Sequence, residues 1–277
     1  MEELRGRNAL ITGAAGGLGG YIARSLAGRK VNLALSDLPS SPLDELVEEL
    51  GGHGVRVETV PADLTDREQL TELVERAEEA IGPLDVLVNN AGLEFGGNFL
   101  STTPAELEAI LDVNLLATMT LTLAALPGMQ ERGHGHVVNM ASLAGKAAVP
   151  HLASYSATKH GVVGFTHALR HEYGSDPVGF SAICPGFISR VGMYGRLETQ
   201  VGEPPGIVGT LPPERVGDAV VRAITKNLPE VIVAKGPVRP LIFLNAFFPR
   251  AMTRLSRTKA ATDFARRMSE ARGRAFD

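Results

Sequence analysis

The sequence predicts an α/β fold: a doubly wound parallel sheet of about seven strands, with helices on both faces and a C-terminal helical extension. Short runs rich in β-branched residues alternate with longer amphipathic segments, and a glycine-rich turn directly follows the first run. Parallel neighbours need crossover connections, and right-handed crossovers place helices on both faces of the sheet. The predicted strands are residues 9–11, 31–35, 55–60, 86–88, 136–138, 180–183 and 231–233.

The helices between these runs are indicated by their spacing and by their starts. Residues 70, 73, 74, 77 and 81 are apolar at helical spacing. Residues 65–68 and 103–106 have the form of capping boxes, and residues 41–42 form a Ser-Pro start. A helical stretch is predicted from Leu107 to Leu126.

Length and composition favour one domain. The chain has 277 residues, 44% hydrophobic and 21% charged, which is ordinary for a protein with a packed core. We expect a sheet domain over residues 1–236 and an extension of it over residues 237–277. Cys184 is the only cysteine, and no secretory or membrane-spanning run is recognised, so a reducing, cytoplasmic setting is expected. Neither a metal site nor a nucleic-acid partner is expected.

The glycine-rich turn predicts a dinucleotide site. It reads Thr12-Gly-Ala-Ala-Gly-Gly-Leu-Gly-Gly20, and such glycines let backbone N–H groups approach a pyrophosphate at the start of a helix. Asp37 ends the second strand, where a carboxylate can bind the adenosine ribose hydroxyls. It would repel a 2′-phosphate, and neither Gly16 nor Leu38 is a cation. NAD is therefore preferred, with NADP as the alternative.

Tyr155 and Lys159 form the candidate catalytic pair. Residues four apart in a helix face the same side. A nearby ammonium, together with the positive ring of an oxidised nicotinamide, favours the phenolate, so the pKa of Tyr155 is expected to fall toward the working pH. Tyr155 can then serve as general base in alcohol oxidation and as general acid in ketone reduction.

Five motifs, in this order and at this spacing, resemble the short-chain dehydrogenase/reductase (SDR) family. They are Thr12-Gly-x-x-x-Gly-x-Gly19, Asn89-Asn-Ala-Gly92, Ser142, Tyr155-x-x-x-Lys159 and Pro185-Gly186. The resemblance extends over about residues 4–233 and is to the single-domain branch. It implies a Rossmann-type fold and an NAD(P)-dependent oxidoreductase acting on CH–OH groups.

The resemblance also implies roles for individual residues. Tyr155 would be the acid/base, Lys159 would also bind the nicotinamide ribose, and Ser142 would hold the substrate oxygen. Asn114 would hold a water in the proton relay, and Asn89 would border the adenosine. Many members carry threonine where this chain has Arg190, which leaves Ser189 as the candidate substitute at the nicotinamide amide. The implied cofactor residues are Gly13, Ala15, Gly17, Leu18, Gly19, Asp37, Asp63, Leu64, Asn90, Gly92, Tyr155, Lys159, Pro185, Gly186 and Ile188.

The expected substrate region is mostly apolar. Its candidate contacts are Ser142, His151, Phe187 and Tyr194, surrounded by Leu93, Phe95, Leu143, Val149 and Met193, with Glu94 as the polar exception. Such a lining favours a lipophilic secondary alcohol or ketone. His151 could bind a substrate oxygen or cap the helix that begins near Ala153. A lid rich in glycine and proline is expected from about residue 189 to 210.

The C-terminal extension is basic and amphipathic. From Arg239 to the end it carries nine Lys/Arg and three Asp/Glu, a net charge of +6. One interpretation is an interfacial helix on an anionic membrane. The favoured interpretation is a helix packed over the pocket or against an acidic surface of a second subunit.

Three functions are compatible with these sequence features. The preferred one is an NAD-dependent dehydrogenase acting on a hydroxyl/ketone pair. The alternatives are a 3-oxoacyl carrier-protein reductase, which would be expected to carry basic residues at positions 16 and 38, and a non-catalytic NAD-sensing protein. A homo-oligomer, dimer or tetramer, is implied by the resemblance, through the helices that contain Asn114 and Tyr155.

Overall fold

Seven parallel strands form the central sheet, as predicted. The computed structural model describes residues 3–174, 176–204 and 209–273, and within them the strand order is β3-β2-β1-β4-β5-β6-β9. The strands are β1 (Asn8–Thr12), β2 (Asn32–Ser36), β3 (Val57–Thr59), β4 (Val86–Asn89), β5 (Gly135–Met140), β6 (Val178–Pro185) and β9 (Glu230–Val233). Each of them overlaps one of the runs predicted as a strand.

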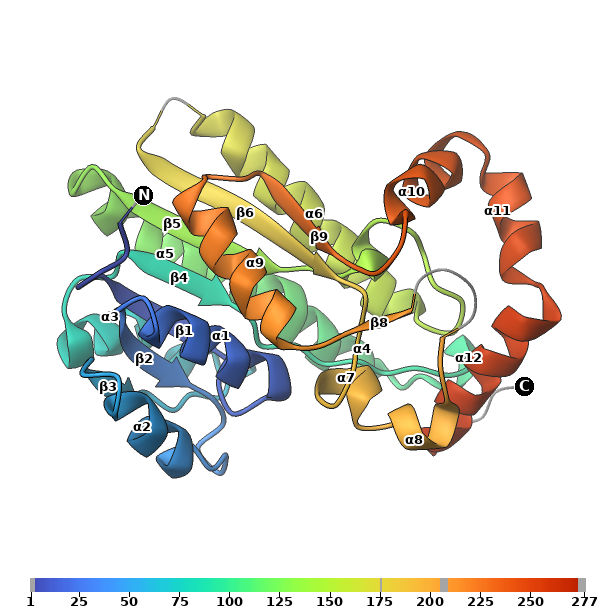
Figure 1. The fold of residues 1–277 in the computed structure, drawn as a ribbon, viewed down its shortest axis with the longest axis horizontal. Coiled ribbons are helices and arrows are strands. Elements are labelled where there is room, and N and C mark those ends of the chain that lie inside the picture. The colour runs from blue at the N-terminus through green and yellow to red at the C-terminus, as the bar shows by residue number, and fades with distance from the viewer. Residues whose placement is uncertain (1–2, 175, 205–208, 274–277) are drawn as a thin grey trace.

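Helices cover both faces of the sheet (Figure 1). One face carries α1 (Gly17–Ala27), α2 (Asp44–Gly51) and α9 (Glu214–Thr225), and the other carries α3 (Arg67–Ile81), α5 (Ala117–Glu131) and α6 (Ala153–Glu172). Side chains alternate between the two layers: Ile11 of β1 packs with the α1 and α9 layer, whereas its neighbour Leu10 packs with the α3 and α5 layer. Both are fully buried, as expected of a parallel sheet covered on both sides.

The strand order reverses between β1 and β4, and this reversal places the site. β1 pairs with β2 on one side and with β4 on the other, so the crossovers that follow β1 and β4 leave in opposite directions. A crevice forms at the carboxyl ends of strands at such a switch point. The glycine turn follows β1, residues 90–94 follow β4, and Ser142 follows β5.

Two of the three predicted helix starts differ in detail. Thr103 caps α4 (Pro104–Leu111) in a complete capping box with Glu106, as predicted. At α3 the cap is Asp66, which accepts from the N–H groups of residues 68 and 69, rather than Thr65. The Ser-Pro start does not cap α2, whose N-cap is Leu43, because the Ser41 hydroxyl donates to Asp37 instead.

The helical stretch predicted from Leu107 to Leu126 contains a π-helical segment, Asp112–Leu116, between α4 and α5. Such segments are rare and occur often at functional sites. By length and composition alone, the run Pro104–Glu131 is the one helix of the described chain that could cross a membrane. Its inner face, however, packs against α3 and the sheet as a core helix.

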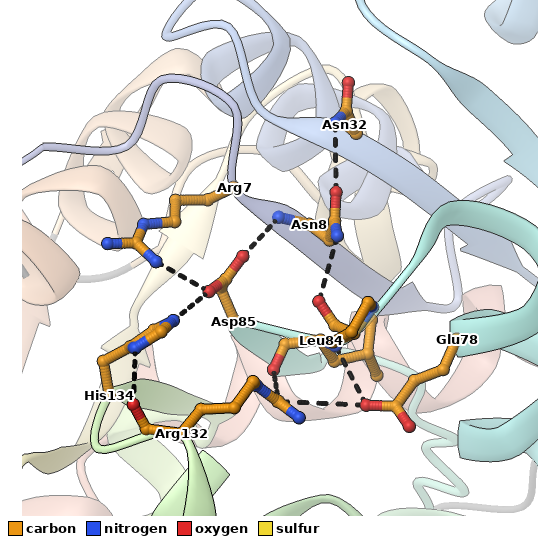
Figure 2. Close-up of polar contacts among 9 residues, drawn as sticks. Arg7, Asn8, Asn32, Glu78, Leu84, Asp85, Arg132 and His134 are labelled. Carbon is orange, nitrogen blue, oxygen red and sulfur yellow. Dashed lines mark hydrogen bonds and ion pairs between the residues drawn. The ribbon is translucent and has the colours of Figure 1, made fainter. Parts of the chain in front are cut away.

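A polar cluster joins three strands at the edge opposite the crevice (Figure 2). Asp85, almost fully buried, accepts from Arg7 Nη1 (3.0 Å), from the backbone N–H of Asn8 (2.9 Å) and from His134 Nε2 (2.7 Å). Arg132 donates to the Leu84 carbonyl (2.6 Å). These contacts tie the segments that precede β1, β4 and β5, far from the glycine turn.

The C-terminal extension forms an arm of three helices: α10 (Val238–Phe247), α11 (Pro249–Ser256) and α12 (Lys259–Ala271). Figure 1 shows α10 and α11 standing away from the sheet, while α12 returns to α7 (Gly192–Gly195) and α8 (Glu198–Val201). Phe264 and Met268 of α12 are buried against Tyr194 and Val201. The favoured expectation of a helix packed beside the pocket thus describes α12 but not α10 or α11.

The expected lid, residues 189–210, contains more regular structure than a loop. It includes α7 and α8, and a two-stranded parallel sheet of β7 (Phe187–Ile188) and β8 (Thr210–Leu211) closes its ends. Residues 205–208 of the lid, and residues 274–277 of the extension, lie outside the described chain.

Candidate active site

A cavity of about 780 Å³ opens at the carboxyl ends of the strands. It extends from Asp37 and Asp63, past the glycine turn, to Tyr155 and on to α12, so one continuous space joins the predicted cofactor and substrate regions. Its second half is lined by apolar side chains from the segments after β4, β5 and β6: Leu93, Leu143, Val149, Leu152, Phe187, Met193 and Tyr194.

The glycine turn approaches other backbone so closely that side chains would not fit. Gly13 has φ +65°, and a Cβ there would lie 2.8 Å from the Cα of Ala91. Asn90 fixes this approach, because its Nδ2 donates to the carbonyls of Thr12 (2.9 Å) and Gly13 (3.0 Å). The loop after β1 is thereby held against the loop after β4.

The start of α1 is suited to an anionic group. Its N-cap is Gly16, no side chain caps its first N–H groups, and its first turn contains no acidic residue. Gly13, Ala15, Gly16, Gly17 and Leu18 all line the cavity. Uncapped N–H groups and the positive end of a helix dipole favour a phosphate there, so the residues present fit a dinucleotide pyrophosphate.

Gly19, implied as a cofactor residue, does not line the cavity. It is buried in α1, and a Cβ there would collide with the Gly13 carbonyl. Its task is therefore packing of the helix beneath the turn. Gly17 does line the cavity, and its missing side chain makes room for Val191 of the lid.

Asp37 is oriented by three donors. Its Oδ2 accepts from the N–H of Ala15 (2.9 Å), and its Oδ1 accepts from the N–H of Leu38 (2.8 Å) and from Ser41 Oγ (2.7 Å). The carboxylate is thus held at the end of β2 beside the glycine turn. Its neighbours in the cavity wall, Ser36, Leu38, Ser41 and Pro42, include no cation.

The remaining implied cofactor residues also line this space. They are Asp63, Leu64, Asn90, Gly92, Pro185, Gly186 and Ile188. Asp63 accepts from the N–H (2.9 Å) and the hydroxyl (2.8 Å) of Thr65. Asn89 is different: it lies inside the protein, where its Nδ2 donates to Asn139 Oδ1 (2.8 Å), and it is not part of the cavity wall.

Ser142, Tyr155 and Lys159 converge in the middle of the cavity. The Ser142 Oγ accepts from the N–H of Ala144 (3.1 Å), and the Ser142 hydroxyl lowers the pKa of the Tyr155 phenol. Lys159 Nζ lies 5.7 Å from the centroid of the Tyr155 ring and donates to the carbonyl of Met140 (2.8 Å) at the end of β5. Tyr155 and Lys159 are both buried, as their spacing on α6 predicts for one helical face.

Electrostatics at the pair differ from the expectation. Burial raises the pKa of Tyr155 far above its usual range, and the negative charge of Glu94 adds to the rise. Burial also lowers the pKa of Lys159 to about 8, so the ammonium itself is weakened as a local cation. From the protein's own groups the tyrosine pKa is therefore raised, not lowered, and a further positive charge is needed to bring it down.

Asn114 is placed by the π-helical segment. Its Oδ1 accepts from the N–H of Leu93 (2.7 Å), while its Nδ2 donates to the Leu93 carbonyl (2.9 Å) and to Thr158 Oγ1 (3.2 Å). The amide thus clamps the loop after β4 onto α6. Gly92 lies between this amide and Lys159: a Cβ at Gly92 would be 3.5 Å from Asn114 Oδ1 and 3.6 Å from Lys159 Nζ.

The predicted substrate residues divide into two groups. Phe187 and Tyr194 line the main cavity with Ser142 and pack edge to face, with ring centroids 5.1 Å apart. His151 lies instead in a smaller neighbouring cavity of about 290 Å³ with Phe95. His151 has φ +64°, and its carbonyl accepts from the N–H of Gly97 (3.0 Å), so it shapes a turn before α6 rather than the substrate wall.

Arg190 and Ser189 also point elsewhere. Arg190 forms an exposed ion pair with Glu214 (2.6 Å), and its N–H donates to Glu198 (3.0 Å). The Ser189 hydroxyl donates to the Leu211 carbonyl (3.3 Å). Neither residue lines the cavity, so the substitution expected for Ser189 is not found in this arrangement.

The residues of the cavity wall that sequence reasoning missed include Val113, Met268 and Arg272. Val113 is brought in by the π-helical segment, which local sequence does not reveal. Met268 and Arg272 belong to α12, whose docking on the lid depends on contacts between distant segments that local sequence does not reveal. Arg272 forms a buried ion pair with Glu94, which explains how a carboxylate is accommodated in this apolar region.

Comparisons with known proteins agree with this geometry. The sequence profile of the short chain dehydrogenase family matches residues 7–201. The chain is 38% identical to the Ketoacyl reductase HetN of Nostoc sp., over 98% of this chain and 96% of that protein. It is 33% identical to the Estradiol 17-beta-dehydrogenase 11 of Rattus norvegicus (90% and 82%), and 40% identical to the Oxidoreductase UcpA of Salmonella typhimurium (68% and 72%). With the parallel sheet, the glycine turn and the match over most of its length, this chain belongs to the short chain dehydrogenase family and is an oxidoreductase.

Proposed function

We propose that this oxidoreductase interconverts a secondary alcohol and a ketone on a lipophilic small molecule, with NAD as the preferred cofactor. The observation that carries the proposal is the position of Tyr155. Its phenol, in the cavity wall with Ser142, lies where the cavity passes from the glycine turn to an apolar half. A reacting carbon at that point would meet the cofactor on one side and the phenol on the other.

Each residue then has a physical task. Ser142 orients the substrate oxygen and Tyr155 exchanges a proton with it. A dinucleotide bound at the glycine turn would supply or accept the hydride. Lys159, held by its hydrogen bond to the Met140 carbonyl, contributes a positive charge beside Tyr155. Asn114 keeps the loop beside Lys159 in place. The apolar walls exclude water from the reacting atoms.

The preference for NAD rests on Asp37. Its carboxylate is aimed by the N–H of Ala15 and by Ser41, where ribose hydroxyls can donate to it. A 2′-phosphate would meet this negative charge with no cation among its neighbours in the wall. Fluorescence titration with NADH and NADPH tests the preference: tighter binding of NADPH would contradict it.

A lipophilic substrate is supported by the lining. Most side chains that border the half of the cavity beyond Tyr155 are apolar, and Glu94 is paired with Arg272. Such walls hold a hydrocarbon skeleton better than a phosphorylated one. The relative named Estradiol 17-beta-dehydrogenase 11, at 33% identity, is consistent with a ring-shaped or long-chain alcohol.

Reduction of a 3-oxoacyl thioester is the second candidate. It is favoured by the 38% identity to the protein named Ketoacyl reductase HetN, which extends over almost the whole of both chains. The first candidate is preferred because positions 16 and 38 are glycine and leucine rather than basic residues. Turnover of a 3-oxoacyl thioester with NADPH, faster than of any lipophilic alcohol with NAD, would reverse this order.

The decisive experiment is a panel of lipophilic alcohols and ketones followed at the nicotinamide absorbance. The Tyr155→Phe variant should lose at least ~100-fold in kcat, because removal of a positioned general acid/base costs about 10² to 10⁴. Tyr173→Phe, at the surface end of the same helix, is the matched control and should keep full activity. Full turnover by Tyr155→Phe would contradict the proposed proton transfer by Tyr155. NADH binding without turnover of any substrate would instead favour an NAD-sensing protein.

A further inference from the structure

Glu94 and Arg272 form an ion pair inside the cavity. Glu94 lies in the loop after β4, and Arg272 follows α12 near the end of the described chain. Glu94 Oε1 contacts Arg272 Nη2, and the two side chains are only 9% and 15% exposed. Residues 178 positions apart in the sequence are thus joined across the substrate half of the cavity.

Each charge of this ion pair is compensated by the other. Neither Glu94 Oε1 nor Arg272 Nη2 has a hydrogen bond to another group of the described chain, so each is satisfied by the ion pair. Burial raises the pKa of Glu94, and the Arg272 charge opposes that rise. Removing one partner from such a pair leaves a buried charge without compensation.

The chain also provides space for the guanidinium. A Cβ at Gly96 would lie 2.6 Å from Arg272 Nη1, so any larger residue there would displace the arginine. Met268, one helical turn before Arg272, lines the same cavity. Arg267 secures the helix from its other side, since its Nε donates to the Val201 carbonyl of α8 (2.8 Å).

Both charges act on the candidate catalytic tyrosine. Glu94 and Arg272 line the cavity with Tyr155. The carboxylate raises the pKa of Tyr155, and the guanidinium lowers it. As long as the pair is intact, the two effects oppose one another.

We propose that Arg272 is a positioning residue of the active site: through Glu94 it holds α12 as a wall of the substrate pocket and balances a carboxylate beside Tyr155. The inference rests on the function proposed above, because it assigns Tyr155 the proton transfer. It gives the C-terminal extension a place in catalysis, which the motifs of the sheet domain do not.

The test is the pH profile of alcohol oxidation. Arg272→Met should move the rise of kcat to higher pH by about one unit, since Glu94 is then an uncompensated negative neighbour at the pH where Tyr155 titrates. Glu94→Gln should move it in the opposite direction. The double variant Glu94→Gln/Arg272→Met should return close to the profile of the unchanged protein, which a purely structural loss would not do.

Arg267→Gln is the matched control on the same helix. It loosens the contact of α12 with α8 without removing a charge from the cavity, so KM should rise while the pH profile stays unchanged. Identical profiles for Arg272→Met, Glu94→Gln and the unchanged protein would overturn the proposal.

A measurement without turnover separates this proposal from the proposed function. Ultraviolet titration of tyrosinate, taken as the difference from the Tyr155→Phe variant, reports the pKa of Tyr155 directly. Opposite shifts in Arg272→Met and Glu94→Gln would support the ion-pair role even if no alcohol or ketone in the panel were a substrate. Circular dichroism of each variant confirms that it folds.

A second feature, independent of the cavity, lies on α10 and α11. Residues 231–262 carry six Lys/Arg and no Asp/Glu. Phe243, Phe247 and Phe248 are 60%, 65% and 57% exposed, and the rings of Phe243 and Phe247 lie 4.5 Å apart. We name these three phenylalanines, with Arg239, Arg250 and Arg254, the aromatic-basic surface.

We infer that the aromatic-basic surface binds an anionic bilayer. Exposed phenylalanines are stabilised by entering the acyl boundary, and flanking arginines by anionic headgroups. Figure 1 shows that α10 and α11 project beyond the sheet, so they can meet a plane while the rest of the chain, with a net charge of −10 before Arg239 (−4 overall less +6), stays away from it.

Co-sedimentation with vesicles tests this inference. The protein should bind phosphatidylcholine/phosphatidylglycerol vesicles, bind pure phosphatidylcholine at least ~10-fold more weakly, and be released by salt. Phe243→Ser/Phe247→Ser should weaken binding by a similar factor, whereas Leu100→Ser, an exposed leucine elsewhere, should not. The inference would be overturned if the protein did not bind anionic vesicles. It would also be overturned if Phe243→Ser/Phe247→Ser abolished self-association of the protein, because the surface would then bind a second copy of the chain.

Discussion

Tyr155 shows how strongly burial can oppose the chemistry a residue is suited for. Its spacing to Lys159 predicts a lowered pKa, but the protein's own groups raise it, because the phenol is withdrawn from water and faces Glu94. Lys159 is withdrawn as well, and burial lowers its pKa to about 8. Sequence spacing places two charges on one helical face, whereas the sign of a pKa shift depends on neighbours brought in from elsewhere in the fold.

Replacing Asp37 should change which cofactor is bound. In Asp37→Ala the ribose hydroxyls lose their acceptor and a 2′-phosphate loses its repulsion. We expect the Kd of NADH to rise about tenfold, as one charge-assisted hydrogen bond is lost, and the ratio of NADPH to NADH affinity to increase. Fluorescence titration measures both. Asp44→Asn, in the first turn of α2, is the control; an unchanged ratio in Asp37→Ala would show that Asp37 does not select the cofactor.

His136 should make the protein less stable in acid. It is fully buried in β5, and burial lowers its pKa to about 3 from an ordinary 6.5. Its Nε2 lies 2.8 Å from Ser181 Oγ, which itself donates to the Leu228 carbonyl, so the neutral ring donates from Nε2. Between pH 6.5 and 3 the unfolded chain binds the proton and the folded chain does not, so stability falls as pH falls.

The size of this effect follows from the same two pKa values. At pH 5 the loss should be about 2 kcal/mol relative to pH 7. His136→Gln keeps a donor but cannot be protonated, so its free energy of unfolding should change less with pH over this range. Urea denaturation at several pH values measures the slopes, with the surface variant His171→Gln as control. Equal slopes for His136→Gln and the unchanged protein would contradict the prediction.

At the scale of elements, the polar cluster around Asp85 fixes the amino ends of three strands (Figure 2). Asp85→Ala removes the acceptor shared by Arg7, the N–H of Asn8 and His134. Because partly buried donors are then left unpaired, we expect a loss of about 2 kcal/mol in the free energy of unfolding, measured by urea denaturation. NADH affinity should not change, because the cluster lies at the edge opposite the glycine turn.

The matched control for Asp85 is Asp263→Ala. Asp263 forms an exposed ion pair with Arg266, 3.4 Å away on α12, and such pairs contribute about 0 to 1 kcal/mol. Equal destabilisation by the two substitutions would show that the cluster is no more than surface charge.

The strands and helices could be predicted from the sequence because the residue patterns that indicate them are local. Seven strand runs and the Thr103 capping box lie where β-branched residues and capping chemistry indicate. The π-helical segment at Asn114 could not be predicted from the sequence, because it depends on contacts with Leu93 and Thr158, which are distant in the chain. The same limit applies to α12, because its contacts with Tyr194 and Val201 of the lid also join segments far apart in the sequence.

At the scale of the whole molecule, the motif residues converge because the strand order reverses between β1 and β4. Carboxyl ends of parallel strands meet at one edge, so the glycine turn, Ser142 and Pro185 could be placed together from sequence. His151 could not be excluded from the site in that way, because a turn with φ +64° directs it to a neighbouring cavity. The walls of a pocket depend on packing between distant segments, which spacing along the chain does not encode.

The outer face of the α4–α5 run should be a subunit interface. Three leucines are exposed on this face: Leu111, Leu116 and Leu123, the last of them to 75%. On the neighbouring α6, Gly164 borders open space, since a Cβ added there would have no atom within 4 Å. An exposed apolar helix face beside small residues fits a two-fold helical interface. Leu123→Asp should therefore raise the dissociation constant of the oligomer at least ~10-fold.

Analytical ultracentrifugation over a range of concentrations measures that change in Leu123→Asp. The control is Leu100→Asp, which places the same charge at a leucine that is 91% exposed in the short 3-10 helix Phe99–Ser101 before α4 and should leave the oligomer intact. Because Leu123 lies on the outer face of α5, its substitution should not lower the free energy of unfolding of the isolated subunit by more than about 0.5 kcal/mol. If the unchanged protein is monomeric at all concentrations, or if Leu123→Asp assembles as tightly as Leu100→Asp, this face is not the interface.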